Sequence, residues 1–529
     1  MGTMCECDVA VVGYGPTGMT LAALLAQAGH TVTLLERYDG LYNLPRAACF
    51  DDEIMRTFQK LGVAEEVMPG AVVQLDYDWV NAAGETLVEI SYEEHAAAGW
   101  AQLYMMYQPH IETVLDRLCK SLPSISVHQG TTVDWLEADE DGVSVRAVRT
   151  GGETVEVRSR YLVGADGGKG FVRPALGIGF SSYGFEENWL VCDFRCPPDL
   201  AGVPTFRQVC DPAQPIAIVR IGPDHHRFSF MLEPDEDPER ATDPERVWAR
   251  VRDYITPEDA EIVRVANYVF RSRITDRWRE GRVMLAGDAA HEMPPFLAQG
   301  MCSGMRDAHN LAWKLDLILD GIAGDELLDT YQPEREPHVR FITEKAIELG
   351  RVQTLRDPQQ ARERDERMLA ARREDRAPEK LRYPPLRGGI LAGGLGATAA
   401  GEFFPQGRVR RAGEEALFDD LVGPGPVVVA RGDALDGLDE EAHEAWRRLG
   451  GRFVTVVAPG AALDADGAEP LALEDLDGTY LRWFEAKGLT AAAVRPDWYL
   501  FAAAADGGEL AGLLGAIGRA LGPPSPTKA

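Results

Sequence analysis

Short apolar runs alternate with amphipathic segments along the first third of the chain. Residues 7–12 (CDVAVV) are apolar and are followed by glycine, which predicts a buried strand. Residues 16–28 carry leucines on one face and precede Gly29, which predicts a helix that ends there. Residues 31–35 predict a second strand. This order is typical of an α/β protein, and similar alternation continues to about residue 180.

The pattern between residues 185 and 275 is different. Apolar and polar positions alternate with a period of two at residues 190–194, 216–221 and 227–232, between turns rich in proline and aspartate. That alternation predicts an antiparallel sheet inserted into the α/β framework. Residues 277–350 return to strand and helix.

The last part of the chain changes character twice. Residues 356–380 are highly charged, which predicts a solvated helix and a linker. After Pro384 the composition shifts to glycine, alanine and leucine, and strand and helix signals alternate at residues 426–431, 440–450, 453–458, 498–503 and 508–521. We therefore expect a separate small α/β domain, and because it contains no cysteine we exclude a thiol redox role for it.

Composition narrows the class of protein. A chain of 529 residues is too long for one core, so two or three domains are expected. The net charge of −30 argues against nucleic acid and anionic membranes as partners. The N-terminus lacks a basic region before its first strand, and no apolar run is long enough to cross a bilayer, so we expect a cytoplasmic protein. None of the eight cysteines forms a CxxC pair, so neither a disulfide framework nor a metal site is expected.

A glycine-rich turn follows the first strand. Gly13, Gly15 and Gly18 have the GxGxxG spacing that permits a tight turn, close approach of the backbone to a pyrophosphate, and close helix–strand packing. Glu36 ends the second strand, where a carboxylate binds the hydroxyls of a ribose. The cluster predicts a dinucleotide site that favours FAD or NAD over NADP; the alternative is a glycine-rich turn of an unrelated α/β protein.

Two more acids follow predicted strands. Asp166 comes directly after the strand at residues 161–163, although an Asp-Gly pair alone usually marks only a turn. Asp288 follows the strand at residues 283–286 and precedes a Pro-Pro turn, a loop and a long amphipathic helix. An acid at a strand end accepts hydrogen bonds from a polyol, and a helix N-terminus offers N–H groups and a positive dipole end. The second acid and the helix together predict a cradle for a cofactor with a polyol chain and an electron-accepting head.

The order of the three motifs resembles that of the class A flavoprotein monooxygenases, which are the single-component FAD-dependent aromatic hydroxylases. The resemblance covers roughly residues 6–350. Residues 45–62 (PRAACFDDEIMRTFQKLG) and 293–315 (MPPFLAQGMCSGMRDAHNLAWKL) are most similar to the 3-(3-hydroxyphenyl)propionate hydroxylase branch, which includes hydroxylases that tailor polyketides and antibiotics. Residues 405–407 and 494–504 resemble the thioredoxin-like appendage of phenol hydroxylases.

This resemblance implies a domain organisation within the α/β class. A Rossmann-like FAD-binding domain would comprise residues 1–180 and 277–380. An antiparallel β-sheet domain at residues 181–276 would bind the substrate, and residues 381–529 would form a thioredoxin-like domain without cysteines.

The resemblance also implies residue roles. The ADP half of FAD would be held by Gly13, Gly15, Gly18 and Glu36, and the ribityl hydroxyls by Asp288. The other implied contacts are Arg46 beside the flavin and pyrophosphate, Gln108 at the ribityl and phosphate region, Asp166 near FAD and NAD(P)H, the Pro295 carbonyl beside the isoalloxazine, and the N–H groups of Gly300, Met301 and Cys302 at the pyrimidine edge. Of these, Pro295 and Arg46 are the expected catalytic residues.

The implied reaction uses NAD(P)H and O2. Reduced FAD would form a C4a-hydroperoxide that hydroxylates a phenol or an aromatic polyketide, in a monomer or homodimer whose only partners are these small molecules. Baeyer–Villiger insertion or another flavin-dependent oxidation in natural-product tailoring remains the alternative.

The chain departs from the family pattern at three positions. Leu297 and Ala298 replace frequent glycines, which should stiffen the loop or alter the pocket, and Gly170 replaces a usual serine. His225 and His226 lie in a predicted turn and are expected to be exposed.

Overall fold

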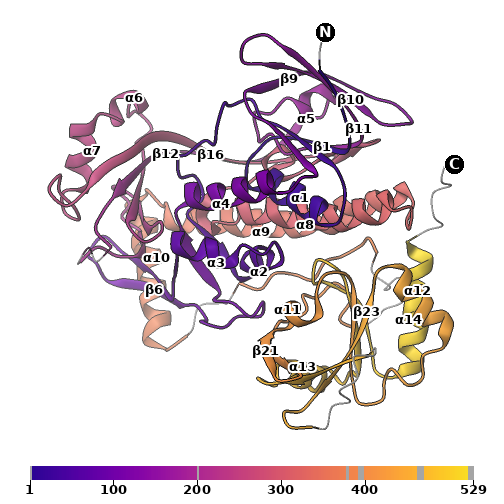
Figure 1. Ribbon diagram of the computed structural model, residues 1–529. Helices are drawn as coiled ribbons and strands as arrows, with labels where there is room; N and C mark the ends of the chain where they lie inside the picture. Colours follow the sequence, from indigo (N-terminus) through magenta and orange to yellow (C-terminus); the bar gives the residue numbers. More distant parts are fainter. Residues whose placement is uncertain are drawn as a thin grey trace.

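The computed structural model is a mixed α/β fold with several sheets (Figure 1). It describes residues 3–198, 200, 202–376, 381–390, 398–461 and 470–521. Residues 377–380 of the predicted linker and residues 522–529 of the predicted C-terminal domain lie outside the described residues.

The first sheet has a parallel centre that sets up the site. Its strands run in the order β17 (Arg279–Glu280), β18 (Val283–Leu285), β11 (Thr154–Gly164), β1 (Thr3–Val12), β2 (Val32–Leu35) and β8 (Ile125–His128), and β10 (Val143–Arg149) and β9 (Thr131–Ala138) extend β11. Val12 pairs with both Gly164 and Leu35, and Gly164 pairs with Leu285. The carboxyl ends of four parallel strands are therefore level with one another.

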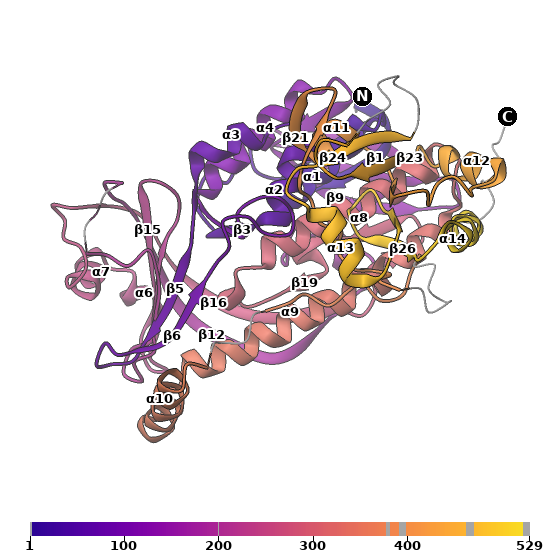
Figure 2. The same cartoon turned by 90° about the horizontal axis from the view of Figure 1, so that it is seen from below.

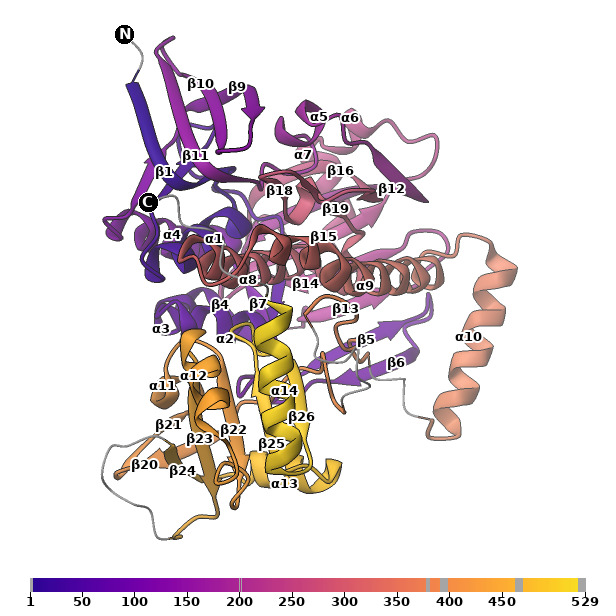
Figure 3. The same cartoon turned by 90° about the vertical axis from the view of Figure 1, so that its right-hand side faces the viewer.

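Long helices pack beside this sheet (Figures 1 and 3). They are α1 (Pro16–Gln27), α4 (Gln108–Ser121), α8 (Gly300–Leu319) and α9 (Tyr331–Gln353), with the short α5 (Val172–Ala175) and the 3-10 turn η4 (Asp325–Thr330). The helix predicted at residues 16–28 is α1. A Cβ added at Gly304 of α8 would lie 2.4 Å from Oγ1 of Thr17, so glycine allows α8 to approach α1 closely.

The second sheet is long, twisted and mostly antiparallel. Its order is β19 (His291–Glu292), β16 (Glu261–Thr275), β12 (Phe180–Arg195), β15 (His225–Met231), β14 (Ile216–Arg220), β13 (Phe206–Val209), β5 (Asp76–Val80) and β6 (Thr86–Ser91). The three segments with period-two alternation overlap β12, β14 and β15. Strands β5 and β6 come from much earlier in the chain, and β5 joins β13 in parallel.

Helices cover parts of the second sheet. Figure 2 shows α6 (Pro238–Ala241) and α7 (Pro244–Val251) at one end and α10 (Pro358–Arg373), the helix of the charged run, near β6. Arg364 of α10 is buried and donates a hydrogen bond of 2.6 Å to the Cys210 carbonyl. The charged helix is therefore fastened to the sheet by a buried arginine.

We call the described residues between 398 and 521 the C-terminal segment. This segment alone forms the third sheet (Figure 3). Its order is β21 (Glu414–Leu417), β20 (Arg408–Arg411), β24 (Leu471–Asp475), β23 (Arg452–Val457), β22 (Val427–Arg431), β25 (Ala491–Val494) and β26 (Leu500–Ala504). The helices are α11 (Phe418–Val422), α12 (Glu440–Arg448), α13 (Thr479–Lys487) and α14 (Gly507–Ala520). The segments predicted at residues 426–431, 440–450, 453–458, 498–503 and 508–521 correspond to β22, α12, β23, β26 and α14.

A small layer lies between the first sheet and the C-terminal segment. It contains the sheet β3 (Cys49–Asp51), β7 (Leu103–Met106) and β4 (Ala71–Val73), with α2 (Asp52–Lys60), α3 (Ala64–Val67) and the 3-10 turn η1 (Met68–Gly70). Arg56 of α2 is buried and binds both carboxylate oxygens of Asp419, at 2.7 and 2.8 Å, and the Phe404 carbonyl. This bidentate pair ties α2 to the C-terminal segment.

All eight cysteines are free, and six of them are buried. Within the described part of the chain, the helices are either too short or too polar to cross a membrane.

Candidate active site

Three acids predicted from sequence lie at one edge of the first sheet. Glu36 follows β2, Asp166 follows β11 and Asp288 follows β18. Because these strands are parallel and in register, their carboxyl ends open at the same edge, where α/β folds bind ligands.

The glycine-rich turn has the geometry expected of a phosphate cradle. Gly13 has a φ of +111°, and a Cβ there would lie 2.3 Å from the Ala165 carbonyl oxygen. A Cβ at Gly18 would lie 2.2 Å from the Gly13 carbonyl oxygen, so α1 lies directly against the turn. At Gly15, which caps α1, an added Cβ would meet nothing within 4 Å. The first N–H groups of α1 therefore lie beside open space.

Glu36 is held by backbone donors. Its carboxylate accepts hydrogen bonds from the Tyr14 N–H at 2.9 Å and the Tyr38 N–H at 3.0 Å. The Tyr14 hydroxyl donates to Asp116 of α4 at 2.9 Å. The acid is thus fixed at the end of β2 and keeps further lone pairs for a ligand.

Asp166 has one satisfied and one free oxygen. Its Oδ2 accepts the N–H groups of Phe171 at 2.5 Å and Val172 at 2.9 Å. Its Oδ1 is buried and has no hydrogen-bond partner in the described structure. Burial raises the pKa of Asp166 above its usual value. A buried acceptor of this kind is expected to meet a ligand donor.

Gly170 packs directly against this carboxylate. A Cβ at residue 170 would lie 2.1 Å from Cγ of Asp166, so a side chain at this position would require Asp166 to move. Gly170→Ala should displace Asp166 and weaken binding of the FAD that the family resemblance implies about tenfold, the cost of roughly one hydrogen bond. Fluorescence titration of the apoprotein with FAD measures the change. Gly179→Ala is the control, because a Cβ there meets nothing within 4 Å; equal affinities for the two variants would contradict the role of the close packing.

Asp288 and Arg46 lie close enough for the charge of each to act on the other. Asp288 is exposed between the buried residues Gly287 and Ala289 in the turn η2 (Gly287–Ala289), and the Arg46 side chain is 43% exposed. Partial burial raises the pKa of Asp288, the charge of Glu292 adds to the rise, and His291 and Arg46 oppose it. Solvent therefore reaches a carboxylate and a guanidinium whose charges attract each other.

The segment that carries Arg46 is fixed from both sides. Oε1 of Gln108 accepts the N–H groups of Arg46 at 3.0 Å and Ala47 at 2.6 Å. From β15, Arg227 donates to the carbonyls of Arg46 at 2.6 Å and Pro45 at 3.0 Å, and it pairs with the buried Asp193 of β12. The second sheet thus positions the backbone of Arg46.

The two histidines of β15 correct an expectation. His225 and His226 are buried, at 7% and 5% exposure, and His225 stacks on Tyr107 with ring centroids 3.9 Å apart. The prediction of exposure was wrong because the strand begins at His225, directly after the Pro-Asp turn, so both rings pack within the sheet.

The start of α8 faces the same edge of the first sheet. Ser303 is the first residue whose N–H binds within the helix, to the Gln299 carbonyl at 2.9 Å. The N–H groups of Gly300, Met301 and Cys302 are therefore not used by the helix. The side chain of Cys302 is fully buried, whereas Gly300 and Met301 are partly exposed.

The loop before α8 is tightly turned. Pro295 is exposed in the turn η3 (Pro295–Leu297), and its carbonyl accepts the Ala298 N–H at 2.8 Å. Ala298 has a φ of +52°, in the left-handed region that favours glycine. An alanine in this conformation costs about 1–3 kcal/mol, which the surrounding contacts must offset.

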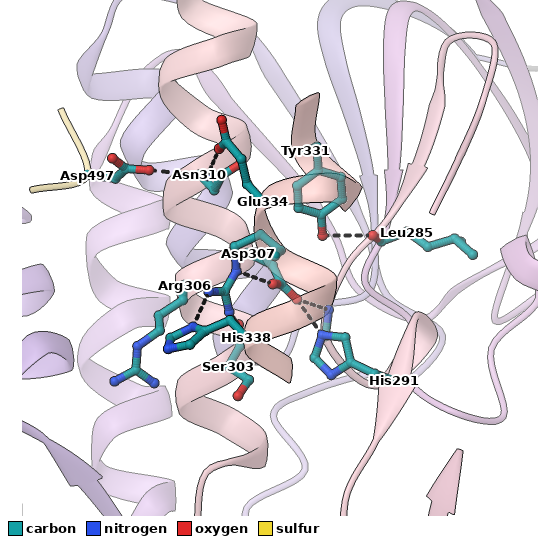
Figure 4. Close-up of polar contacts among 12 residues, drawn as sticks. Leu285, His291, Ser303, Arg306, Asp307, Asn310, Tyr331, Glu334, His338 and Asp497 are labelled. Atoms are coloured by element: carbon teal, nitrogen blue, oxygen red, sulfur yellow. Dashed lines mark hydrogen bonds and ion pairs between the residues drawn. The ribbon is translucent and has the colours of Figure 1, made fainter. Parts of the chain in front are cut away.

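A buried polar network supports the turn that carries Asp288 (Figure 4). Asp307 of α8 accepts hydrogen bonds from the Gly287 N–H at 3.1 Å, His291 Nε2 at 2.6 Å and Arg335 Nε at 2.9 Å. Burial opposes the charge of Asp307, but His291 and Arg335 hold its pKa below the usual value. In the same network Tyr331 donates to the Leu285 carbonyl at 3.0 Å. The end of β18 is thus anchored to α8 and α9.

Comparisons with known proteins place this geometry in a family. A family model described as "FAD binding domain" matches residues 6–346. A "Probable NADH-specific resorcinol 4-hydroxylase" of Rhodococcus jostii is 55% identical over 527 residues, which cover 98% of this chain and 97% of that protein. The chain belongs to the FAD-dependent aromatic hydroxylases.

Other relatives of the hydroxylase agree with this assignment. A "3-(3-hydroxy-phenyl)propionate/3-hydroxycinnamic acid hydroxylase" of Mycobacterium avium is 33% identical, with 93% of this chain and 88% of that protein covered. The crystal structure of aklavinone-11 hydroxylase with FAD and aklavinone is similar, with a TM-score of 0.75 and 26% identity over 97% of this chain and 99% of that one. A model described as "HcaD C-terminal domain" matches residues 401–520. These relatives are hydroxylases, so Baeyer–Villiger insertion is not favoured.

The hydroxylase uses FAD and a reduced nicotinamide to hydroxylate phenolic compounds. The described residues fit FAD in three independent respects, namely the open space beside Gly15, the free buried oxygen of Asp166 and the accessible carboxylate of Asp288.

The buried residues that hold the predicted FAD contacts in place were not predicted from the sequence. They include Arg306 and Asp307 of α8 and Arg335 of α9, all almost fully buried. One signal was available: an adjacent Arg-Asp pair lies within the long predicted helix. Their partners lie far away in the chain and have no local pattern.

Proposed function

We propose that this hydroxylase adds a hydroxyl group to a small phenol of the resorcinol type, with NADH as the reductant. The observation that carries the proposal is the 55% identity to the probable NADH-specific resorcinol 4-hydroxylase over nearly the full length of both chains. The aromatic polyketides of the structural neighbours are a less favoured substrate class, because identity to aklavinone-11 hydroxylase is only 26%.

We infer that FAD lies across the carboxyl edge of the first sheet. Gly13, Gly15, Gly18 and Glu36 would hold its ADP half. Arg46 and Gln108 would lie at the pyrophosphate, Asp166 near the middle of the cofactor, and Asp288 at the ribityl hydroxyls. When bound, FAD supplies hydride acceptance from NADH and activation of O2.

The chain's own residues would orient the ring and stabilise its charge. The free N–H groups at Gly300, Met301 and Cys302 would donate to the pyrimidine edge, where negative charge on the reduced flavin is favoured by a helix N-terminus. The Pro295 carbonyl would lie beside the ring and Arg46 would supply a positive charge near it. The second sheet, which positions Arg46 through Arg227, would cover the ring and keep water from the substrate.

The domain organisation belongs to the same proposal. The FAD-binding unit would comprise residues 1–180 and 277–380, the substrate unit residues 181–276, and the thioredoxin-like unit residues 381–529. The three separate sheets support this division, with the addition that β5 and β6 contribute to the sheet of the substrate unit. We expect a cytoplasmic monomer or homodimer.

The test is steady-state oxidation of NADH and NADPH by the holoenzyme with resorcinol, 3-(3-hydroxyphenyl)propionate and aklavinone. We expect resorcinol to stimulate NADH oxidation and to yield benzene-1,2,4-triol, with one oxygen atom from 18O2. Product and coupling are measured by mass spectrometry and peroxide assay. Fastest coupled turnover with aklavinone, or a preference for NADPH, would refute the corresponding part of the proposal.

A further inference from the structure

Arg306 organises a buried cluster behind the start of α8. Each of its three nitrogens donates to a different side chain: Nε to Glu53 at 2.6 Å, Nη1 to Gln299 at 2.9 Å and Nη2 to Asp51 at 2.5 Å. The arginine is 4% exposed. We call Arg306, Asp51, Glu53, Gln299 and Tyr499 the Arg306 cluster.

Gln299 connects this cluster to the helix start. It is the N-cap residue of α8, directly before Gly300. Arginine only donates hydrogen bonds, so it fixes the Gln299 amide with its oxygen toward the guanidinium and its NH2 group away. The position of the cap therefore depends on how firmly Arg306 is held.

Glu53 connects the same arginine to the C-terminal segment. It lies in the first turn of α2, and its carboxylate accepts the hydroxyl of Tyr499 at 3.1 and 3.3 Å. Tyr499 is 6% exposed and precedes β26. In Figure 1 helix α2 lies between α8 and the C-terminal segment.

The Tyr499 hydroxyl matters because of the charges within the Arg306 cluster. One guanidinium faces the two carboxylates Asp51 and Glu53. Asp51 also accepts the Ile54 N–H at 3.2 Å, whereas the side-chain donors to the Glu53 carboxylate in the described structure are Arg306 and Tyr499. When a buried carboxylate loses one hydrogen-bond donor, its burial costs more free energy, and it attracts its remaining donor more strongly. Loss of the Tyr499 hydroxyl would pull Arg306 toward Glu53 and away from Gln299.

We infer that Tyr499 is a positioning residue for the flavin end of the active site, acting through Glu53 and Arg306 on the cap of α8. This inference rests on the proposed contact between residues 300–302 and the flavin pyrimidine edge. It gives the C-terminal segment a part in setting the properties of the bound cofactor, although the segment places no residue in the predicted FAD cradle.

The experiment compares Tyr499→Phe with Tyr480→Phe in the full-length holoenzyme. Tyr480 is also buried, at 0% exposure, and its hydroxyl accepts the Gly407 N–H at 2.9 Å within the C-terminal segment. The readouts are FAD affinity by fluorescence, the visible spectrum and reduction potential of bound FAD, and the unfolding midpoint. Tyr499→Phe should weaken FAD about three- to tenfold and alter the spectrum and potential, whereas Tyr480→Phe should change only the unfolding midpoint.

A second variant keeps the inference testable if Tyr499→Phe does not fold. Glu53→Gln keeps the shape of the side chain but weakens its attraction for Arg306, so it should alter the flavin spectrum in the opposite direction to Tyr499→Phe. If Tyr499→Phe matches Tyr480→Phe in FAD affinity, spectrum and potential, Tyr499 has only a structural role and the inference is overturned. Failure of the wild type to hydroxylate resorcinol would overturn the proposed substrate but leave these cofactor measurements decisive.

Discussion

Asp307→Asn is expected to destabilise the folded protein by about 3–5 kcal/mol, the cost of breaking a buried ion pair by removing one charge. Asp307 is fully buried and pairs with Arg335 at 2.9 Å, and Arg335 is 1% exposed. Asparagine has nearly the same volume, so the loss comes from the uncompensated guanidinium rather than from a cavity. Urea unfolding of the apoprotein, followed by circular dichroism, measures the difference.

The same substitution should also weaken FAD binding. Oδ2 of Asp307 accepts the Gly287 N–H, and Gly287 immediately precedes Asp288. Asp316→Asn is the matched control, because Asp316 lies on the same helix and pairs with His30 at 2.8 Å but its side chain is 35% exposed. We expect this control to cost about 1 kcal/mol or less. Equal losses of unfolding free energy in the two variants would contradict the expectation that the buried ion pair contributes more stability than the exposed one.

Asp288→Ala is expected to raise the dissociation constant of FAD about 10- to 100-fold, the loss of one or two hydrogen bonds to a charged acceptor. Asp288 is exposed, so removal of its carboxylate should leave the apoprotein folded. Flavin content after gel filtration and titration of the apoprotein measure the effect.

The control for this substitution is Asp329→Ala. Asp329 is 72% exposed, forms a surface ion pair with Arg279 and is not among the predicted FAD contacts. It should retain the FAD affinity of the wild type. Unchanged flavin content in Asp288→Ala would refute the ribityl contact, whatever the control shows.

The sequence predicts the residues that line the site better than the buried residues that hold them in place. Gly13, Glu36, Asp166 and Asp288 each follow a strand that a short apolar run marks, so strand order alone brings them to one edge. Asp307, Arg306 and Tyr499 carry no such signal. Arg306 and Asp51 are 255 positions apart, and Tyr499 and Glu53 are 446 apart.

Some strands could not be predicted from the sequence either, for physical reasons. The sequence of β25 is Ala-Ala-Ala-Val, and alanine has little preference for strands, so its position depends on pairing with β22 and β26. Strand β5 joins the second sheet through parallel pairing with β13, a contact between distant segments that no local period reveals.

The long-range contacts of α2 and α9 have a consequence for folding during synthesis. The buried Glu334 has Arg495 as a partner at 2.8 Å, 161 positions later, and Glu53 has Tyr499. At bacterial and eukaryotic elongation rates the ribosome needs on the order of ten to thirty seconds to reach Arg495 after Glu334. Until then these acids lack partners that the finished protein supplies. A nascent chain with all three FAD motifs complete would therefore still lack the contacts that the last strands supply to α2 and α9.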